Sequence, residues 1–198
     1  HRRRGYQDVR DIEIIMAKTL ISTHTASSDS SIDITSGIDG TYDVYEFHFV
    51  GIHAETLHTD FEFQVNASDD TGGDFDTSLI TSSFFRNYMG EAGDYAGPTY
   101  KADRDLAQSA GYQELSYMID QDDGDESLAG ILTLYDPSST TYVKHFMSRT
   151  NANHHNGEYT LECFAAGYIN QTLAIPEIRF RFHSGDIDAG TIKMFGVS

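Results

Sequence analysis

The feature that most constrains the fold is the alternation of apolar and polar side chains with a period of two. In the segment 60–66 (DFEFQVN), Phe61, Phe63 and Val65 alternate with polar residues. A β-strand directs successive side chains to opposite faces, so this pattern predicts a strand with one buried face. The segments 45–49 (YEFHF) and 177–182 (EIRFRF) repeat it. In no long segment do apolar residues recur with the helical period of 3.6 residues, so the sequence predicts an all-β protein.

Further strands are predicted over the ranges 79–88, 112–119, 128–135, 142–149, 158–169 and 190–197. Turn-rich segments such as Gly90–Pro98 and Asn151–Gly157 lie between them. Residues 103–108 (DRDLAQ) predict one or two helical turns capped by Asp103. Short strands separated by turns indicate a sandwich or a barrel, and we expect an antiparallel β-sandwich with about eight to ten strands and at most one short helix.

The 198 residues fit one domain, and we expect a single β-sandwich over residues 16–198. Residues 1–15 stand apart because the first five (HRRRG) are basic and Met16 resembles a natural start. Three interpretations of this extension stay open: an arm that docks on an acidic neighbour, an added segment, or the tail of a longer chain. We expect no signal peptide and no membrane span, since no run of about 18 apolar residues occurs.

The charge balance argues against nucleic acid as a partner. The chain has 13 Lys and Arg against 31 Asp and Glu, which gives a formal net charge of −18. Nucleic acid binding depends on cationic contacts with phosphates, which so acidic a surface repels. The same charge favours solubility and suits a salty medium, where screening weakens self-repulsion.

The single cysteine, Cys163, excludes an intrachain disulfide and a cysteine-based metal cluster. It lies in an alternating run with Leu161 and Ala165. We therefore expect a small buried core residue rather than a reactive thiol.

Two loops are rich in carboxylates, which are the ligands that Ca²⁺ prefers. The first contains Asp120, Asp122, Asp123 and Asp125, and the second is 66–76 (NASDDTGGDFD). The spacing does not match an EF-hand, so we expect solvated acidic turns, with a weak Ca²⁺ site as the alternative. No other cofactor is expected.

The histidines and loop tyrosines do not indicate a metal site. His154 and His155 are adjacent in an Asn-rich segment, for which we expect an exposed loop. His48 lies among aromatic residues and is expected to be a packed strand residue. Loop tyrosines serve sugar stacking and protein interfaces equally well, and we expect these to be loop anchors: Tyr6, Tyr95 and Tyr100.

The sequence contains no catalytic motif. The GxSxG and HExxH patterns are absent, and no Cys/His pairing is indicated. A glycosidase needs two carboxylates across the scissile bond, but among 31 acidic residues some pair always looks suitable. We therefore expect no catalytic residues and no enzyme activity.

Several segments together resemble a group of virion structural proteins of tailed phages that infect marine bacteria and cyanobacteria. The order and spacing carry the resemblance, which extends from about Met16 to the end. The segments are 38–45 (IDGTYDVY), 61–64 (FEFQ), 80–86 (ITSSFFR), 105–109 (DLAQS), 126–130 (ESLAG), 136–146 (DPSSTTYVKHF), 165–168 (AAGY) and 184–196 (SGDIDAGTIKMFG).

The resemblance implies a jelly-roll-like structural protein on the surface of a virion, made in the host cytoplasm. Such a protein would be a head decoration, a head fibre or a tail component, and it implies no functional residues. We expect a homo-oligomer, first of all a trimer, in contact with other virion proteins. The alternative is a lectin-like module that binds host surface glycans or a receptor through its loops, with Ca²⁺ as a possible aid.

Overall fold

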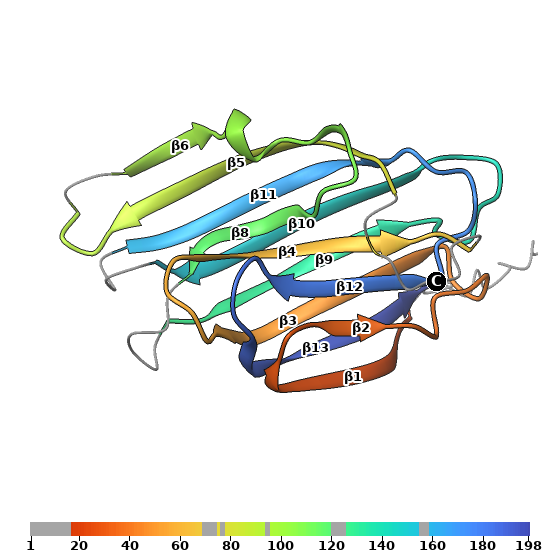
Figure 1. The fold of residues 1–198 in the computed structure, drawn as a ribbon, viewed down its shortest axis with the longest axis horizontal. Helices are drawn as coiled ribbons and strands as arrows, with labels where there is room; N and C mark the ends of the chain where they lie inside the picture. Colours follow the sequence, from red (N-terminus) through yellow and green to blue (C-terminus); the bar gives the residue numbers. More distant parts are fainter. Residues whose placement is uncertain (1–16, 69–74, 76–77, 94–95, 120–125, 155–158) are drawn as a thin grey trace, which may run out of the picture.

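The computed structural model describes residues 17–68, 75, 78–93, 96–119, 126–154 and 159–198. Over these residues thirteen strands form two antiparallel sheets, one lying over the other (Figure 1). The predicted all-β antiparallel sandwich is thus confirmed, whereas eight to ten strands were expected. Among the described residues no helix is long and apolar enough to cross a membrane.

The large sheet contains nine strands. Their order across the sheet is β1 (Lys18–Asp29), β13 (Ile187–Val197), β3 (Val44–Ala54), β9 (Leu128–Tyr135), β10 (Lys144–Asn153), β11 (Tyr159–Ile169), β5 (Ile80–Gly90) and β6 (Ala96–Tyr100), and β7 (Ala107–Ser109) also pairs with β5. In Figure 1, β1 lies at the lower edge of this sheet and β6 at the upper edge.

The small sheet contains four strands, which lie in front of the large sheet in Figure 1. Their order is β2 (Ile32–Ile34), β12 (Glu177–Phe182), β4 (Thr59–Asn66) and β8 (Gln113–Ile119). The facing sides of the two sheets enclose the core.

A cluster of phenylalanines forms the centre of that core. The ring of Phe180 on β12 lies 5.4 Å from that of Phe47, 5.2 Å from that of Phe49 and 6.1 Å from that of Phe61. All four side chains are buried. Aromatic rings bury a large area each, so the alternating phenylalanines recognised in the sequence account for much of the packing between the sheets.

The strands that the sequence did not predict are β1, β2, β6 and β7. β1 (KTLISTHTASSD) is mostly exposed and rich in Ser and Thr, so it lacks the apolar alternation that reveals a half-buried strand. β6 overlaps the expected turn Gly90–Pro98, and β10 continues to Asn153, into the expected turn Asn151–Gly157.

The predicted helical turns over 103–108 are largely wrong. A single 3₁₀ turn, η1, covers Ala102–Arg104 and has no side-chain cap, and β7 follows. The carboxylate of Asp105 accepts a hydrogen bond from the Phe84 N–H at 2.7 Å, and the Leu106 N–H donates to Ser82 Oγ at 2.9 Å. These bonds to β5 hold the chain extended in place of a helix.

Candidate functional site

The outward-facing sides of the two sheets differ in chemistry. The small sheet presents paired charges, and the large sheet presents apolar side chains with few charges. A surface that binds a partner is expected to differ in this way from a surface that faces water, and each of the two sides is a candidate functional site.

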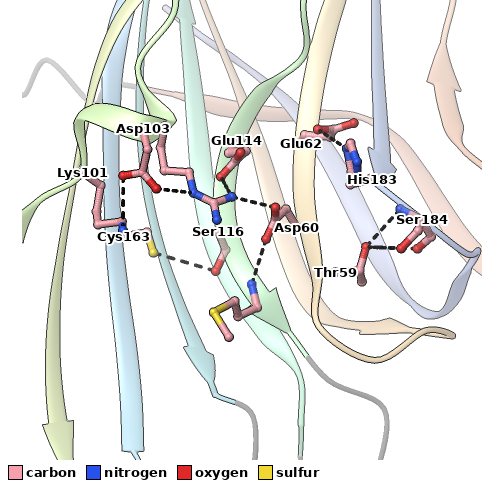
Figure 2. Close-up of polar contacts among 12 residues, drawn as sticks. Thr59, Asp60, Glu62, Lys101, Asp103, Glu114, Ser116, Cys163, His183 and Ser184 are labelled. Carbon is pink, nitrogen blue, oxygen red and sulfur yellow. Dashed lines mark hydrogen bonds and ion pairs between the residues drawn. The ribbon is translucent and has the colours of Figure 1, made fainter.

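On the small sheet, Arg104 of η1 joins two carboxylates from different strands. Its Nη1 donates to Asp60 Oδ2 at 2.7 Å and to Glu114 Oε2 at 2.6 Å. Figure 2 shows the carboxylates of Asp60 and Glu114 joined to the same guanidinium group. Asp60 also accepts a hydrogen bond from the Met118 N–H at 2.9 Å, and Lys101 and Asp103 form an ion pair at 3.2 Å. The network fastens the turn η1 to β4 and β8.

The network continues toward β12, and the pKa values of two of its carboxyl groups are raised. Burial, and then the nearby charge of Asp60, raise the pKa of Glu114 to about 7. Burial also raises the pKa of Glu62, although Arg181 donates to it at 2.8 Å and His183 Nδ1 lies 3.8 Å away. A carboxyl group with a pKa near 7 can exchange a proton at neutral pH.

The geometry of this network is that of an ion-pair cluster. A glycosidase holds two carboxyl groups apart with the sugar between them. Here Asp60 and Glu114 bind the same guanidinium nitrogen, so Arg104 occupies the space between them. Within the described part of the chain, no three His, Cys, Asp or Glu side chains are grouped to hold a metal ion.

On the large sheet, strand register places outward-facing side chains in rows. One row runs across six strands and contains Lys193, His48, Ile131, Arg149, Phe164 and Phe85. Phe85 stacks on Phe164 at 4.7 Å between ring centroids, and the Arg149 guanidinium lies 5.5 Å from the centre of the Phe164 ring. We call the outward side of β13, β3, β9, β10, β11 and β5 the outer face.

Large apolar side chains stand exposed on the outer face. Met147 is 58% exposed, Phe85 43% and Ile131 37%. Two open grooves cross it: one of about 540 Å³ is bordered by Ile131, Arg149 and Glu162, and one of about 520 Å³ by Tyr135, Met147 and Tyr168. Contiguous apolar surface of this kind marks interaction sites more often than random surface does.

The structure corrects one prediction about the aromatic and histidine residues and confirms another. His154 is buried, not exposed: its ring stacks on that of Tyr159 at 4.1 Å, and Nε2 lies 2.7 Å from the Tyr159 hydroxyl. His48 packs in its strand as predicted, with its ring 4.7 Å from that of Phe195. Tyr100 is the last residue of β6, beside the segment that leads to η1, and its hydroxyl donates to Asp105.

The Ca²⁺ candidates Asp120, Asp122, Asp123 and Asp125 lie outside the described residues, as do Tyr6, Tyr95, His155 and most of the loop 66–76. Of that loop, Asn66 is described within β4, where its side-chain amide donates to Glu177 at 2.9 Å. A Ca²⁺ site therefore stays a prediction.

Cys163 is buried, as the alternation predicted, with its Sγ 3.9 Å from Ser116 Oγ. Burial raises the pKa of its thiol to about 12, so almost no thiolate exists at pH 8.

The native protein is expected to release no colour from Ellman's reagent at pH 8 over an hour. Once unfolded in guanidinium, it should release one equivalent of the coloured thiolate per chain, because Cys163 is then exposed. Prompt reaction of the native protein would contradict the burial.

Two features of these surfaces were not found from the sequence. Arg104 was placed in a helical turn with no partner, because Asp60 is 44 residues away. The outer face was missed because its rows combine side chains from six strands, and no segment of sequence contains them together. The available signal was an apolar residue at a strand position where the alternation calls for a polar one, such as Met147 on β10.

Comparison with protein-family models, with curated protein sequences and with solved structures found no match.

Proposed function

We propose that the chain is a non-enzymatic structural protein on the surface of a phage particle, and that it assembles as a homo-oligomer through the outer face. The observation that carries the assembly role is the exposed apolar surface of that face, centred on Ile131 and Met147. The assignment to a virion rests on the resemblance of the sequence segments. The strand count, the core and the ion-pair network are compatible with a protein that has no catalytic task.

The size of the outer face is adequate for a stable contact. Six strands spaced by about 4.8 Å, each with about ten residues at about 3.4 Å rise, cover about 1,000 Å². A specific interface of ordinary size buries about 800 Å² on each partner. One face against another copy would therefore suffice without any contribution from the loops.

The charges of the outer face also permit contact between identical chains. Two molecules that each carry a formal net charge of −18 repel one another. On this face, however, Arg149 and Lys193 stand beside Glu46 and Glu162, and Arg149 Nε donates to Glu162 at 2.6 Å. The face is thus locally neutral, which avoids the repulsion that other surfaces would produce.

The connectivity supports the jelly-roll interpretation. Along the chain, β1 to β4 alternate between the large and the small sheet, and β8, β9, β12 and β13 cross between them again. Eight strands that cross repeatedly between two sheets are typical of a jelly roll. We infer that β5, β6, β7, β10 and β11 are additions that widen the large sheet and thereby the outer face.

The double variant Ile131→Lys/Met147→Lys is expected to sediment at a lower mass than the wild-type chain at the same concentration. A charge placed at the centre of an interface costs about 2 kcal/mol or more, which is about 30-fold in Kd for each site. Analytical ultracentrifugation over a concentration series measures the change. The melting temperature should hardly move, because both side chains face outward.

The matched control is Leu57→Lys/Tyr142→Lys, which changes two large hydrophobic residues that are at least as exposed as Ile131 and Met147 and lie outside the outer face. This control should leave the sedimentation mass unchanged. A wild-type chain that stays monomeric at tens of micromolar, or an equal effect of both double variants, would refute assembly through the outer face.

A further inference from the structure

Arg86 on β5 is an exception to the charge pairing of this protein. Each of the other described arginines donates to at least one carboxylate: Arg104, Arg149, Arg179 and Arg181. Within the described part of the chain, Arg86 forms no ion pair and donates no hydrogen bond, and its Nε is buried without an acceptor. An arginine without a counter-ion is unexpected in a chain that has 31 Asp and Glu against 13 Lys and Arg.

Arg86 lies on the inward side of β5, where the large sheet extends past the small one. Strand register places it opposite the buried Cys163 of β11 and opposite Thr99 of β6. In Figure 1, β5 and β6 lie beyond β8, which is the edge strand of the small sheet. Arg86 is only half-buried at this place, so a small ion can reach it from solvent.

Two tyrosine rings hold the guanidinium group of Arg86. Its Cζ lies 4.7 Å from the centre of the Tyr88 ring and 5.2 Å from that of the Tyr117 ring. The negative face of an aromatic ring attracts a cation. These contacts supply no acceptor oxygen, however, and a guanidinium group has five N–H donors. The rings therefore fix the position of the group and leave its donors available.

Two further cations surround the Tyr117 ring. Arg104 Cζ lies 5.0 Å from the centre of this ring and Lys101 Nζ lies 5.7 Å from it. Like charges gathered around one ring repel one another, and the repulsion is stronger where water is partly excluded. An anion among these cations would relieve that repulsion.

The neighbouring carboxylates compensate only part of this charge. Asp60 and Glu114 both accept from Arg104. Asp103 forms its ion pair with Lys101. Glu114 has a pKa of about 7, so it is only about half ionised at pH 7. A small excess of positive charge remains, and it lies on the unpaired Arg86.

The hydroxyl of Tyr117 is a second donor without an acceptor. Tyr117 is 2% exposed, and its hydroxyl is buried with no partner among the described residues. Buried donors are almost always paired in folded proteins. An oxyanion accepts several charge-assisted hydrogen bonds from a guanidinium group. We propose that Arg86 and the Tyr117 hydroxyl bind one small oxyanion, which is a sulfate, phosphate or carboxylate group.

This site is independent of the proposed function. Arg86 points inward, whereas Ile131 and Met147 point outward from the same sheet. The variant Ile131→Lys/Met147→Lys should therefore bind the anion as the wild-type chain does. Anion binding and assembly through the outer face can fail separately.

Equilibrium dialysis against radiolabelled sulfate at constant ionic strength tests the site. We expect one sulfate per chain with a Kd of about 1–10 mM, as suits one ion held by a few donors. Arg86→Gln should weaken binding by about ten-fold or more, because an amide carries no charge. Tyr117→Phe keeps the ring beside Arg86 and removes only the hydroxyl, and it should weaken binding by about three- to ten-fold.

Arg149→Gln is the matched control. It removes the same side chain from the outer face, where Arg149 is paired with Glu162, and it should bind sulfate as the wild-type chain does. The site is overturned if the wild-type chain shows no saturable binding at tens of millimolar sulfate. Equal binding by Arg86→Gln and the wild-type chain would also overturn it. Unchanged binding by Tyr117→Phe would remove the hydroxyl as a ligand and with it the two-donor site.

Glucose sulfate as a second probe distinguishes two sources of the same chemistry. Binding about ten-fold or more tighter than that of inorganic sulfate would identify the oxyanion as a substituent of a larger molecule. Equal binding of the two probes would identify a free ion. Both results support the site if Arg86→Gln weakens the binding of both probes, and they overturn it if this variant weakens neither.

Discussion

Phe180→Ala is expected to lower the free energy of unfolding by about 3–5 kcal/mol. Phe180 is fully buried at the centre of the sandwich, where its ring contacts rings from both sheets. Its removal loses the transfer free energy of the ring and leaves a cavity that the rigid sheets cannot close. Urea unfolding followed by circular dichroism measures the change as a lower midpoint with an unchanged slope.

Phe85→Ala is the matched control. It removes the same atoms from the outer face, where Phe85 is 43% exposed. Among the described aromatic rings, Phe85 stacks only on Phe164. Its cost should be about 1 kcal/mol, since an aromatic pair at the surface contributes about that much. Equal losses in the two variants would show that Phe180 is not the centre of the core.

The second large effect concerns pH. The wild-type chain is expected to lose stability as the pH rises from about 4.5 to about 7, in part because of Glu114. Burial raises the pKa of Glu114 to about 7 in the folded chain, above the value of 4.5 for an exposed carboxyl. Over this window the folded chain holds a proton that the unfolded chain has released, so raising the pH favours unfolding.

Glu114→Gln should abolish this contribution. The amide keeps an oxygen that can accept from Arg104 but carries no titrating proton. The difference in stability between the variant and the wild-type chain should therefore grow in favour of the variant from pH 4.5 to about 7 and stay constant above. With allowance for screening by solvent, the difference should reach about 1–2 kcal/mol.

The control for this titration is Glu91→Gln. Glu91 is exposed in the turn after β5, so the substitution removes the same formal charge outside the network. The pH dependence of its free energy of unfolding should run parallel to that of the wild-type chain. A Glu114→Gln curve that also runs parallel would show that Glu114 titrates at an ordinary pH.

The fold was predictable where a strand has one side against the core. Phe61, Phe63 and Val65 alternate with polar residues because β4 is packed on one side and exposed on the other. The same reasoning failed for β1, because the side of this strand that faces inward is mostly polar: Ser22 and His24 are half-buried and only Ala26 is buried. It also failed for His154, because its ring contacts are with Tyr159 and with Tyr117 of β8, and its own sequence neighbours, Asn153 and His155, give no sign of burial.

The candidate site was predictable only in its components. Asp60 and Glu62 were recognised as outward-facing residues of a strand, as were Arg179 and Arg181. That Arg104 joins Asp60 to Glu114 depends on the position of η1 against β4 and β8, and Asp60 lies 44 positions before Arg104 in the sequence. A high pKa for Glu114 follows from that burial and cannot be read from its neighbours in sequence.

The sequence by itself determined that this chain forms strands, which side of most of them is apolar, and that its surface is strongly acidic. These properties are local, because the direction of a side chain along a strand depends only on the parity of its position. The tertiary structure alone decided which strands are neighbours, and hence that Ile131, Met147 and Phe85 share one exposed face and that β1 stands at an open edge. Register and edge position arise from pairing between residues far apart in the chain, where no period in the sequence records them.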